Sequence, residues 1–228
     1  NKSLALDDEK QKNTAAIQCV VAVTKSGRKD ITSYVRGKEK NADSLYYAKS
    51  SFLEFTSEED AEIYVLYSGH TFQYVKRAAP GGVGLVLNHY NRRSLDHYLA
   101  RFDDAFAASS APWPNSFFND SYEVYGSNWA ADMLNEFYQE HGYRMELYLP
   151  EFLGEGDSDT SARVVTDYRQ TLARLLETNF IIPWTEWAHS HGAKTRNQAH
   201  GSPANIIDLY AAVDIPECET YGRSVFDI

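Results

Sequence analysis

The chain has 228 residues and a formal net charge of −10, and 43% of its residues are hydrophobic and 14% aromatic. The acidic charge argues against nucleic acid as a partner, because a phosphate binder needs a basic face. No run of about 18 apolar residues is present, so we expect no membrane partner either.

The ends of the chain and its cysteines say little about its compartment. The sequence begins at Asn1 without a methionine and has no signal peptide, so we expect that a signal, a tag or a domain has been removed from its front. Cys19 and Cys218 lie far apart, and two thiols do not decide the redox compartment.

The first part of the chain favours β-strands. Short runs rich in β-branched and aromatic residues, bounded by turn residues, predict strands at 18–24, 30–35, 51–56 and 62–68. We therefore expect residues 1–60 to form a β-rich or irregular N-terminal segment, and residues 61–228 to form a second domain.

Strands and helices alternate in the second half. Ser94 is the expected N-cap of a helix whose apolar face contains Leu95, Leu99 and Phe102. A long helix is expected at 161–191 with a kink at Pro183, and a later one should be capped by Ser202 with Pro203 at its first position. The remaining expected elements are strands at 116–118, 194–199 and 212–215 and a helix at 128–141.

Polar residues follow three of these strands where each strand ends. The three groups are Asn119, Asp120 and Glu123; Asn197, Gln198 and His200; and Glu217 and Glu219. Such repetition is typical of the catalytic face of a barrel, so we predict the α/β class with a (β/α)8 TIM-like barrel. A complete barrel needs about 250 residues. We therefore expect a partial barrel, truncated at its C-terminus, whose open strand edges need the rest of its own chain as a partner.

Two carboxylates at such strand ends suit glycoside hydrolysis. Glu123 is the first candidate for the acid that protonates the leaving oxygen, and Glu217 or Glu219 is the candidate partner that activates water or attacks the sugar. Asp120 is a candidate for binding sugar hydroxyls or a metal, and His200 for donating a hydrogen bond to substrate. The alternative for these residues is structural, since strand-end acids also cap helices or pair with arginines.

Other chemistries have weaker signals. His189, His191 and His200 are candidate zinc ligands, but residues two apart do not share a helix face and the HExxH spacing is absent. The loop at 76–82 contains two cations and lacks a phosphate-loop signature, which favours a sugar contact or a plain turn. No GxSxG sequence is present, which argues against a serine hydrolase.

Several stretches in order resemble the α-L-rhamnosidases of glycoside hydrolase family 106. They are VKRAAPGGVGLVLNHYN, FFNDSYEVYG, EFYQEHGY with LYLPEFLG, VVTDYRQTLARLLETNF, WAHSHGAKTRNQAHGSPANIIDLY and DIPECETYG, between about residues 75 and 222. The resemblance implies a bacterial, inverting, Ca²⁺-dependent hydrolase of terminal α-L-rhamnosyl linkages on a (β/α) barrel, located in the periplasm or outside the cell. The implied partner is a rhamnose-containing glycan or glycoside.

The resemblance also implies roles for individual residues. Glu123 would be the general acid, Glu219 a catalytic residue and Glu217 a metal ligand. Substrate would contact Asn119, Asp120, Asn197 and His200. Family chains usually continue to a further strand-end glutamate, which leaves the general base open between Glu219 and a residue beyond Ile228. The alternative function is a non-catalytic carbohydrate-binding or degenerate barrel fragment.

Overall fold

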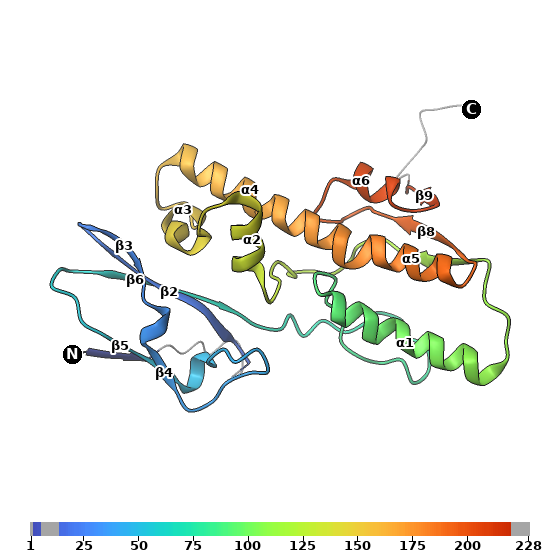
Figure 1. The fold of residues 1–228 in the computed structure, drawn as a ribbon, viewed down its shortest axis with the longest axis horizontal. Coiled ribbons are helices and arrows are strands. Elements are labelled where there is room, and N and C mark those ends of the chain that lie inside the picture. Colours follow the sequence, from blue (N-terminus) through green and yellow to red (C-terminus); the bar gives the residue numbers. More distant parts are fainter. Residues whose placement is uncertain (1, 6–13, 220–228) are drawn as a thin grey trace. The chain divides into compact units, whose positions relative to one another are not determined.

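The computed structural model describes residues 2–5 and 14–219, and it consists of two compact units (Figure 1). Unit 1 contains residues 1–72 and 131–168, and unit 2 contains residues 73–130 and 169–228. The boundary falls inside one helix, between Tyr168 and Arg169.

Unit 1 contains two antiparallel sheets of three strands. One has the order β1-β5-β4 and the other the order β3-β2-β6. The strands are β1 (Lys2–Ala5), β2 (Ala16–Thr24), β3 (Gly27–Asp30), β4 (Val35–Gly37), β5 (Ser51–Phe55) and β6 (Glu62–Ser68).

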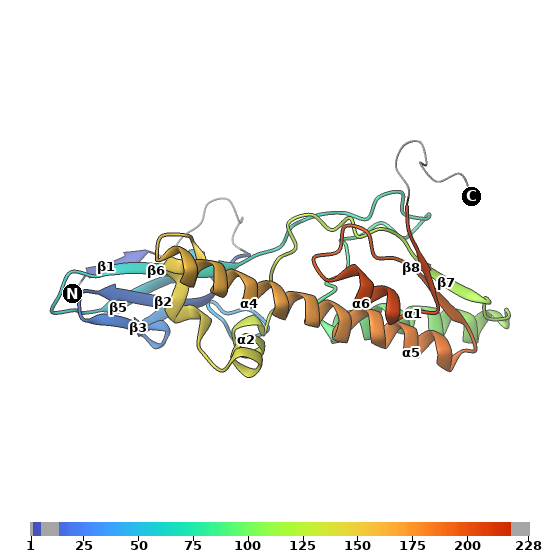
Figure 2. The ribbon, with the colours of Figure 1, turned by 90° about the horizontal axis from the view of Figure 1, so that it is seen from above.

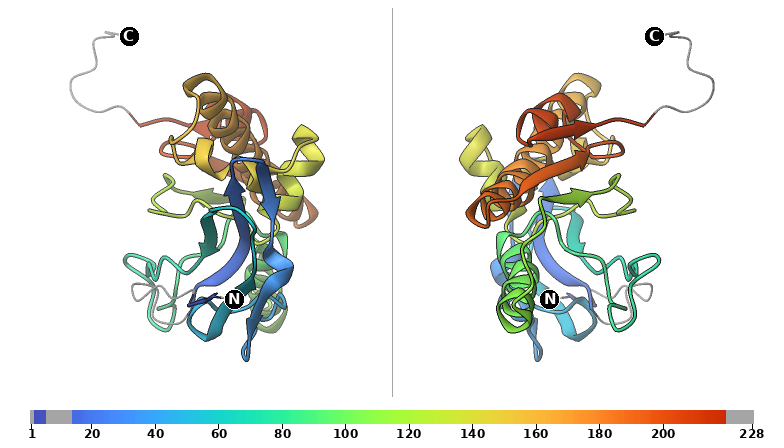
Figure 3. Two further views of the ribbon diagram at one scale, coloured as in Figure 1. Left: turned by 90° about the vertical axis from the view of Figure 1, so that its left-hand side faces the viewer. Right: turned by 90° about the vertical axis from the view of Figure 1, so that its right-hand side faces the viewer.

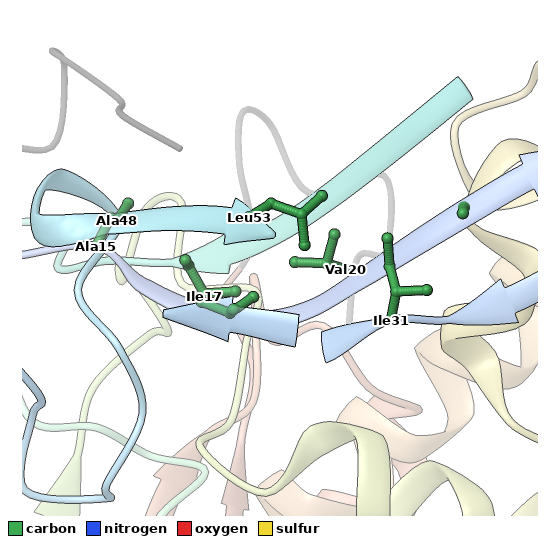
Figure 4. Close-up of a cluster of buried hydrophobic side chains, with 8 residues drawn as sticks. Ala15, Ile17, Val20, Ile31, Ala48 and Leu53 are labelled. Atoms are coloured by element: carbon green, nitrogen blue, oxygen red, sulfur yellow. The ribbon is translucent and has the colours of Figure 1, made fainter. Parts of the chain in front are cut away.

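Strand β2 is buried on both faces because apolar residues fill it almost without a break. A bulge between Ile17 and Cys19 adds one residue, so Ile17 and Val20 share a face although they are three residues apart. Both pack with Ile31 and Leu53 in the core between the strands (Figure 4). Cys19 lies on the opposite face, in a second cluster.

Three helical elements complete unit 1: α2 (Met133–His141), α3 (Leu149–Phe152) and the first part of α4 (Ser158–Leu176). Two buried acids belong to the segment that contains α3, and each meets an arginine. Glu146 pairs with Arg144 at 2.5 Å, and Glu151 accepts two hydrogen bonds from Arg28 on β3. These pairs supply counter-charges to carboxylates that are only 8% exposed.

Unit 2 is built around a parallel sheet with the order β7-β8-β9. Its strands are β7 (Ser116–Asn119), β8 (Lys194–Gln198) and β9 (Ile215–Glu217), and its helices are α1 (Arg92–Ser109), the end of α4, α5 (Ile182–Ser190) and α6 (Ile206–Ala211). Figure 3 (right) shows the three strands side by side in green, orange and red.

Helices α1 and α5 lie next to this sheet (Figure 2). They meet through the rings of Phe102 and Trp187, whose centroids are 6.2 Å apart. On β8, the buried Thr195 hydroxyl lies 3.3 Å from the hydroxyl of Thr185 on α5. Polar groups in the sheet–helix layer are therefore matched to each other.

The expected capping residues were wrong. Asn91 caps α1, because its side chain accepts a hydrogen bond from the Ser94 amide, and α1 begins before Ser94. Asn205 caps α6 in the same way through the Ile207 amide, so Pro203 precedes the helix and is not its first residue. An asparagine oxygen reaches the second or third amide of a helix as well as a serine does.

The expected break in the long helix was confirmed, and the structure shows its form. A π-helical turn at Glu177–Ile181 separates α4 from α5, and Pro183 lies in the first turn of α5. Proline has no N–H to donate and clashes with the carbonyl four residues earlier. The wider turn places the proline where an amide donor is not required.

The barrel prediction was wrong. Each sheet in the described residues has three strands and two open ends, and none of them closes. The strand expected at 62–68 pairs antiparallel with β2. In the short apolar run at 85–87, Leu85 makes an isolated antiparallel bridge to Tyr74. These runs therefore do not extend the parallel sheet. The fold is mixed α/β, with a short parallel sheet in unit 2.

The strand expected at 30–35 was also wrong. The Asp30 carboxylate accepts hydrogen bonds from the Thr32 amide and hydroxyl, and this local turn ends β3 at Asp30. A short 3₁₀ turn then precedes β4. Separately, among the helices of residues 14–219, none combines the length and apolar character needed to cross a bilayer.

Candidate active site at the ends of the parallel strands

The three parallel strands bring the predicted polar groups to one edge. Asn119 is aligned with Asn197, and Gln198 is aligned with Glu217. Because side chains alternate along a strand, Asn119 and Asn197 share one face while Gln198 and Glu217 share the other. The ends of β7, β8 and β9 therefore present two groups of side chains, one on each face.

The two asparagines form the first group. The Asn119 amide donates to the Asn197 side-chain oxygen at 2.7 Å. Asn197 is 1% exposed, and its own side-chain nitrogen is buried without a hydrogen-bond partner among the described residues. A buried amide donor without an acceptor costs free energy. The Asn197 side-chain nitrogen is therefore available to donate to a further group at this edge.

Gln198 joins two acids on the other face. With its nitrogen oriented toward them, the Gln198 amide donates to Asp120 at 3.0 Å and to Glu219 at 3.3 Å. Asp120 also accepts from the Ser121 amide at 2.8 Å. One neutral side chain thus brings together two predicted site residues from different loops.

Glu217 has a different environment. Its carboxylate accepts from Arg196 at 2.5 Å, and the Arg196 guanidinium lies 5.1 Å from the centre of the Phe118 ring. Glu217 is therefore neutralised by an arginine, as the structural alternative predicted for a strand-end acid. Glu219 contacts the neutral side-chain amide of Gln198.

Glu123 lies on the loop after β7, and its partners come from the segment before α1. Its carboxylate pairs with Lys76 at 2.7 Å, and its backbone oxygen accepts from the Gln73 side chain at 2.6 Å. Gln73 also accepts from the Tyr125 amide at 2.8 Å. The hydrogen bond from Lys76 lowers the pKa of the Glu123 carboxyl.

His200 contributes through its backbone. Its carbonyl accepts a hydrogen bond from the Tyr122 amide at 2.8 Å, which ties the loop after β8 to the loop after β7. Gly201 follows with φ +79°, and a Cβ there would lie 2.6 Å from the Tyr122 carbonyl oxygen. Only glycine fits this approach, so the two loops depend on it.

Four residues of this region were missed as site residues: Gln73, Lys76, Arg196 and Gln198. Alternation along 194–198 could have placed Arg196 and Gln198 on one face. The cations of the loop at 76–82 were noticed, but their partner could not be found from sequence. Lys76 meets Glu123 across 47 positions, which no local pattern shows.

The resemblance implies a calcium site with Glu217 as one ligand. Residues 14–219 contain no group of three or more His, Cys, Asp and Glu side chains placed to bind a metal. Glu217, the expected ligand, is paired with Arg196. The expected zinc ligands are also engaged separately, His189 with Asp214 and His191 with Asp103. Calcium remains a prediction of the resemblance.

Comparison with known proteins gives consistent results. A protein of Formosa agariphila named "Putative beta-glucuronidase" is 28% identical over 177 residues, which cover 72% of this chain and 15% of that protein. The rhamnosidase structure from Novosphingobium sp. PP1Y matches with a TM-score of 0.61 at 23% identity, over 85% of this chain and 19% of that one. The chain therefore spans less than a fifth of either relative.

The family comparison covers most of the same region. The glycoside hydrolase 106 model, described as alpha-L-rhamnosidase, matches residues 65–224, which contain every predicted site residue. The match extends over well more than half of the chain and confirms the resemblance drawn from its sequence. The chain belongs to glycoside hydrolase family 106.

Proposed function

We propose that this chain contributes the acid and base side of a site that hydrolyses terminal α-L-rhamnosyl linkages with inversion. The observation on which this rests is the pairing of Asp120 and Glu219 through Gln198, at the same strand ends as the Asn119–Asn197 pair. Acidic and amide groups gathered at the carboxyl ends of parallel strands suit the binding of a sugar and the activation of water.

The environments of the acids separate their roles. A general base must be ionised and able to accept a proton from water, and an arginine partner weakens a carboxylate for this task. Glu217 has that partner and Glu219 contacts a neutral amide. We therefore assign the base to Glu219 and leave Glu217 to orient Arg196.

The proposed reaction balances as a single displacement. Glu123, protonated, gives its proton to the glycosidic oxygen as the bond to the anomeric carbon breaks. Glu219 takes a proton from water as the water oxygen forms the new bond on the opposite face. The products are rhamnose of inverted configuration and the free alcohol, with the proton now on Glu219.

Sugar binding is assigned to the remaining groups. The free Asn197 donor and the Asp120 carboxylate are suited to ring hydroxyls, with Asn119 orienting Asn197. His200 is exposed and adjoins the loop contact with Tyr122, from which its ring can approach the same edge. A bound Ca²⁺ would add a Lewis-acidic partner for hydroxyls. The proton transfers proposed for Glu123 and Glu219 do not depend on this ion.

The substrate is proposed as a rhamnose-containing glycan or glycoside, and the place of action as the periplasm or the cell exterior. Support for the substrate comes from the family and from the rhamnosidase fold neighbour. Polymeric glycans do not cross membranes readily, which favours an enzyme located where they are found.

Substrates with two different leaving groups test the assignment of Glu123 as acid and Glu219 as base. Glu123→Gln should lower hydrolysis of methyl α-L-rhamnoside by about 10²–10⁴-fold and of p-nitrophenyl α-L-rhamnoside much less, because nitrophenolate leaves without a proton. Glu219→Gln should impair both substrates alike. Glu186→Gln, on the exposed surface of α5, is the matched control and should change neither.

The inverting stereochemistry and the role of Glu123 as acid are measured by different experiments. Proton NMR of the first product should show the inverted anomer before mutarotation. Unchanged hydrolysis in Glu123→Gln would remove the acid assignment, and a retained anomer would remove the inverting mechanism. Rhamnose binding without hydrolysis by the wild-type chain would favour the carbohydrate-binding alternative.

A further inference from the structure

The surroundings of Glu123 in this structure favour its ionised form, although the proposed general acid must carry a proton. A general acid at neutral pH needs a raised pKa, which burial or a neighbouring carboxylate supplies. Glu123 instead has a 50% exposed side chain and a cation 2.7 Å away. Something must remove Lys76 from Glu123 before the proposed proton transfer occurs.

The position of Glu123 does not depend on Lys76 alone. Gln73 fixes the loop by donating to the Glu123 carbonyl and accepting from the Tyr125 amide, at 2.6 Å and 2.8 Å. The Lys76 ammonium also lies 5.3 Å from the Tyr125 ring centre. Lys76 can therefore change partner while the backbone around Glu123 stays in place.

The ion pair is weak enough to exchange. The Lys76 side chain is 60% exposed, and ion pairs between exposed groups contribute little net stability because water solvates both charges. The group that Lys76 binds is a carboxylate, and another carboxylate has the same geometry and charge. A ligand that offers one therefore competes with Glu123 for the Lys76 ammonium.

Charge around the loop favours an anionic ligand. Arg77 follows Lys76, is exposed, and also acts on Glu123 through its charge. Two cations against one carboxylate leave a local positive excess, in a chain whose formal net charge is −10. Such a local excess attracts an acidic sugar to a surface that otherwise repels it.

We propose that Lys76 is a specificity-determining residue that binds the carboxylate of a uronic acid attached to the scissile rhamnosyl unit, and thereby releases Glu123 to take up its proton. This inference rests on the proposed function for the identity of Glu123 as the acid. The carboxylate contact itself does not, because it is a binding property of the loop at 73–77.

The first test measures binding and needs no turnover. Methyl β-D-glucuronide and its neutral isostere methyl β-D-glucoside are titrated into the full chain, with loop chemical shifts observed by NMR. We expect about tenfold tighter binding of the glucuronide, a typical discrimination for one charge-assisted contact. Lys76→Met should abolish the preference, Lys76→Arg should retain most of it, and Lys38→Met, at an exposed lysine of unit 1, should leave it intact.

The second test follows the Glu123 carboxyl carbon, assigned by its loss in Glu123→Gln. Its titration midpoint should rise in Lys76→Met, and it should also rise in the wild type when the glucuronide binds but not when the glucoside is added. Equal binding of the two sugars, or a preference that survives Lys76→Met, would overturn the proposal. Failure of the hydrolysis assays with the binding preference intact would refute only the catalytic assignment.

Discussion

The pair formed by Arg28 and Glu151 gives the sharpest stability prediction. Glu151 is 8% exposed and accepts from both terminal nitrogens of Arg28, at 2.6 Å and 2.5 Å, while Arg28 also donates to the Leu147 carbonyl at 2.9 Å. Arg28→Met removes the counter-charge and leaves a buried carboxylate. Losing one partner of such a pair costs about 3–5 kcal/mol.

Equilibrium unfolding in urea, followed by far-UV circular dichroism, measures this cost. The control is Arg163→Met, which removes an exposed helical pair whose partners are 74% and 72% exposed and should cost about 0.3–0.5 kcal/mol. Tryptophan fluorescence adds a second probe, because all four tryptophans lie in unit 2 while Arg28 lies in unit 1.

The pH dependence of the unfolding free energy should have opposite signs in the wild type and in Arg28→Met. The hydrogen bonds from Arg28 lower the pKa of Glu151 below its ordinary value of 4.5, so the wild type loses this stability only as pH falls below about 4.5. In Arg28→Met, burial raises that pKa, and the variant should gain stability as pH falls from 7 toward 5. A cost no larger than that of Arg163→Met, with no such gain, would refute the counter-charge explanation.

Three further outcomes are expected. Burial of the His89 ring lowers its pKa to about 4, so protonation favours the unfolded state, and stability should fall by at most about 3 kcal/mol between pH 6.5 and 4; His89→Phe should flatten that slope in urea titrations. Iodoacetamide should label the exposed Cys218 rapidly and Cys19 only on unfolding, because burial raises the pKa of the Cys19 thiol; mass spectrometry of native protein would show the contrast. In thermal melts, Gly201→Ala should cost more stability than the roughly 1–2 kcal/mol of left-handed backbone strain, because its Cβ would lie 2.6 Å from a carbonyl oxygen. Gly126→Ala is the control, because Gly126 has φ +72° and open space, so that only the backbone strain is measured.

Local sequence patterns predicted where the strands lie better than they predicted which strands pair with each other. Short runs rich in β-branched and aromatic residues located β5 and β6, and the strand-end polarity located the edge where Asn119 and Asn197 meet. Pairing direction is decided by contacts far along the chain, which periodicity does not encode. For this reason β6 was expected in the parallel domain although it pairs antiparallel with β2.

The distinction between Glu217 and Glu219 illustrates the same limit within the site. The strand expected at 212–215 would have put both acids in the loop beyond it, with nothing to separate them. In the structure β9 extends to Glu217, which lies opposite Gln198 and close enough to Arg196 to pair with it. A shift of a few residues in one strand decided which acid met the arginine.

The two proposed catalytic carboxylates therefore contact side chains from different parts of the chain. Glu219 contacts Gln198 of the neighbouring strand, a neutral side chain. Glu123 depends on Lys76, an exposed side chain on a loop 47 positions earlier. A removable cation makes the acid's pKa depend on what else binds that cation. The proposed response to substrate binding therefore belongs to the acid, Glu123.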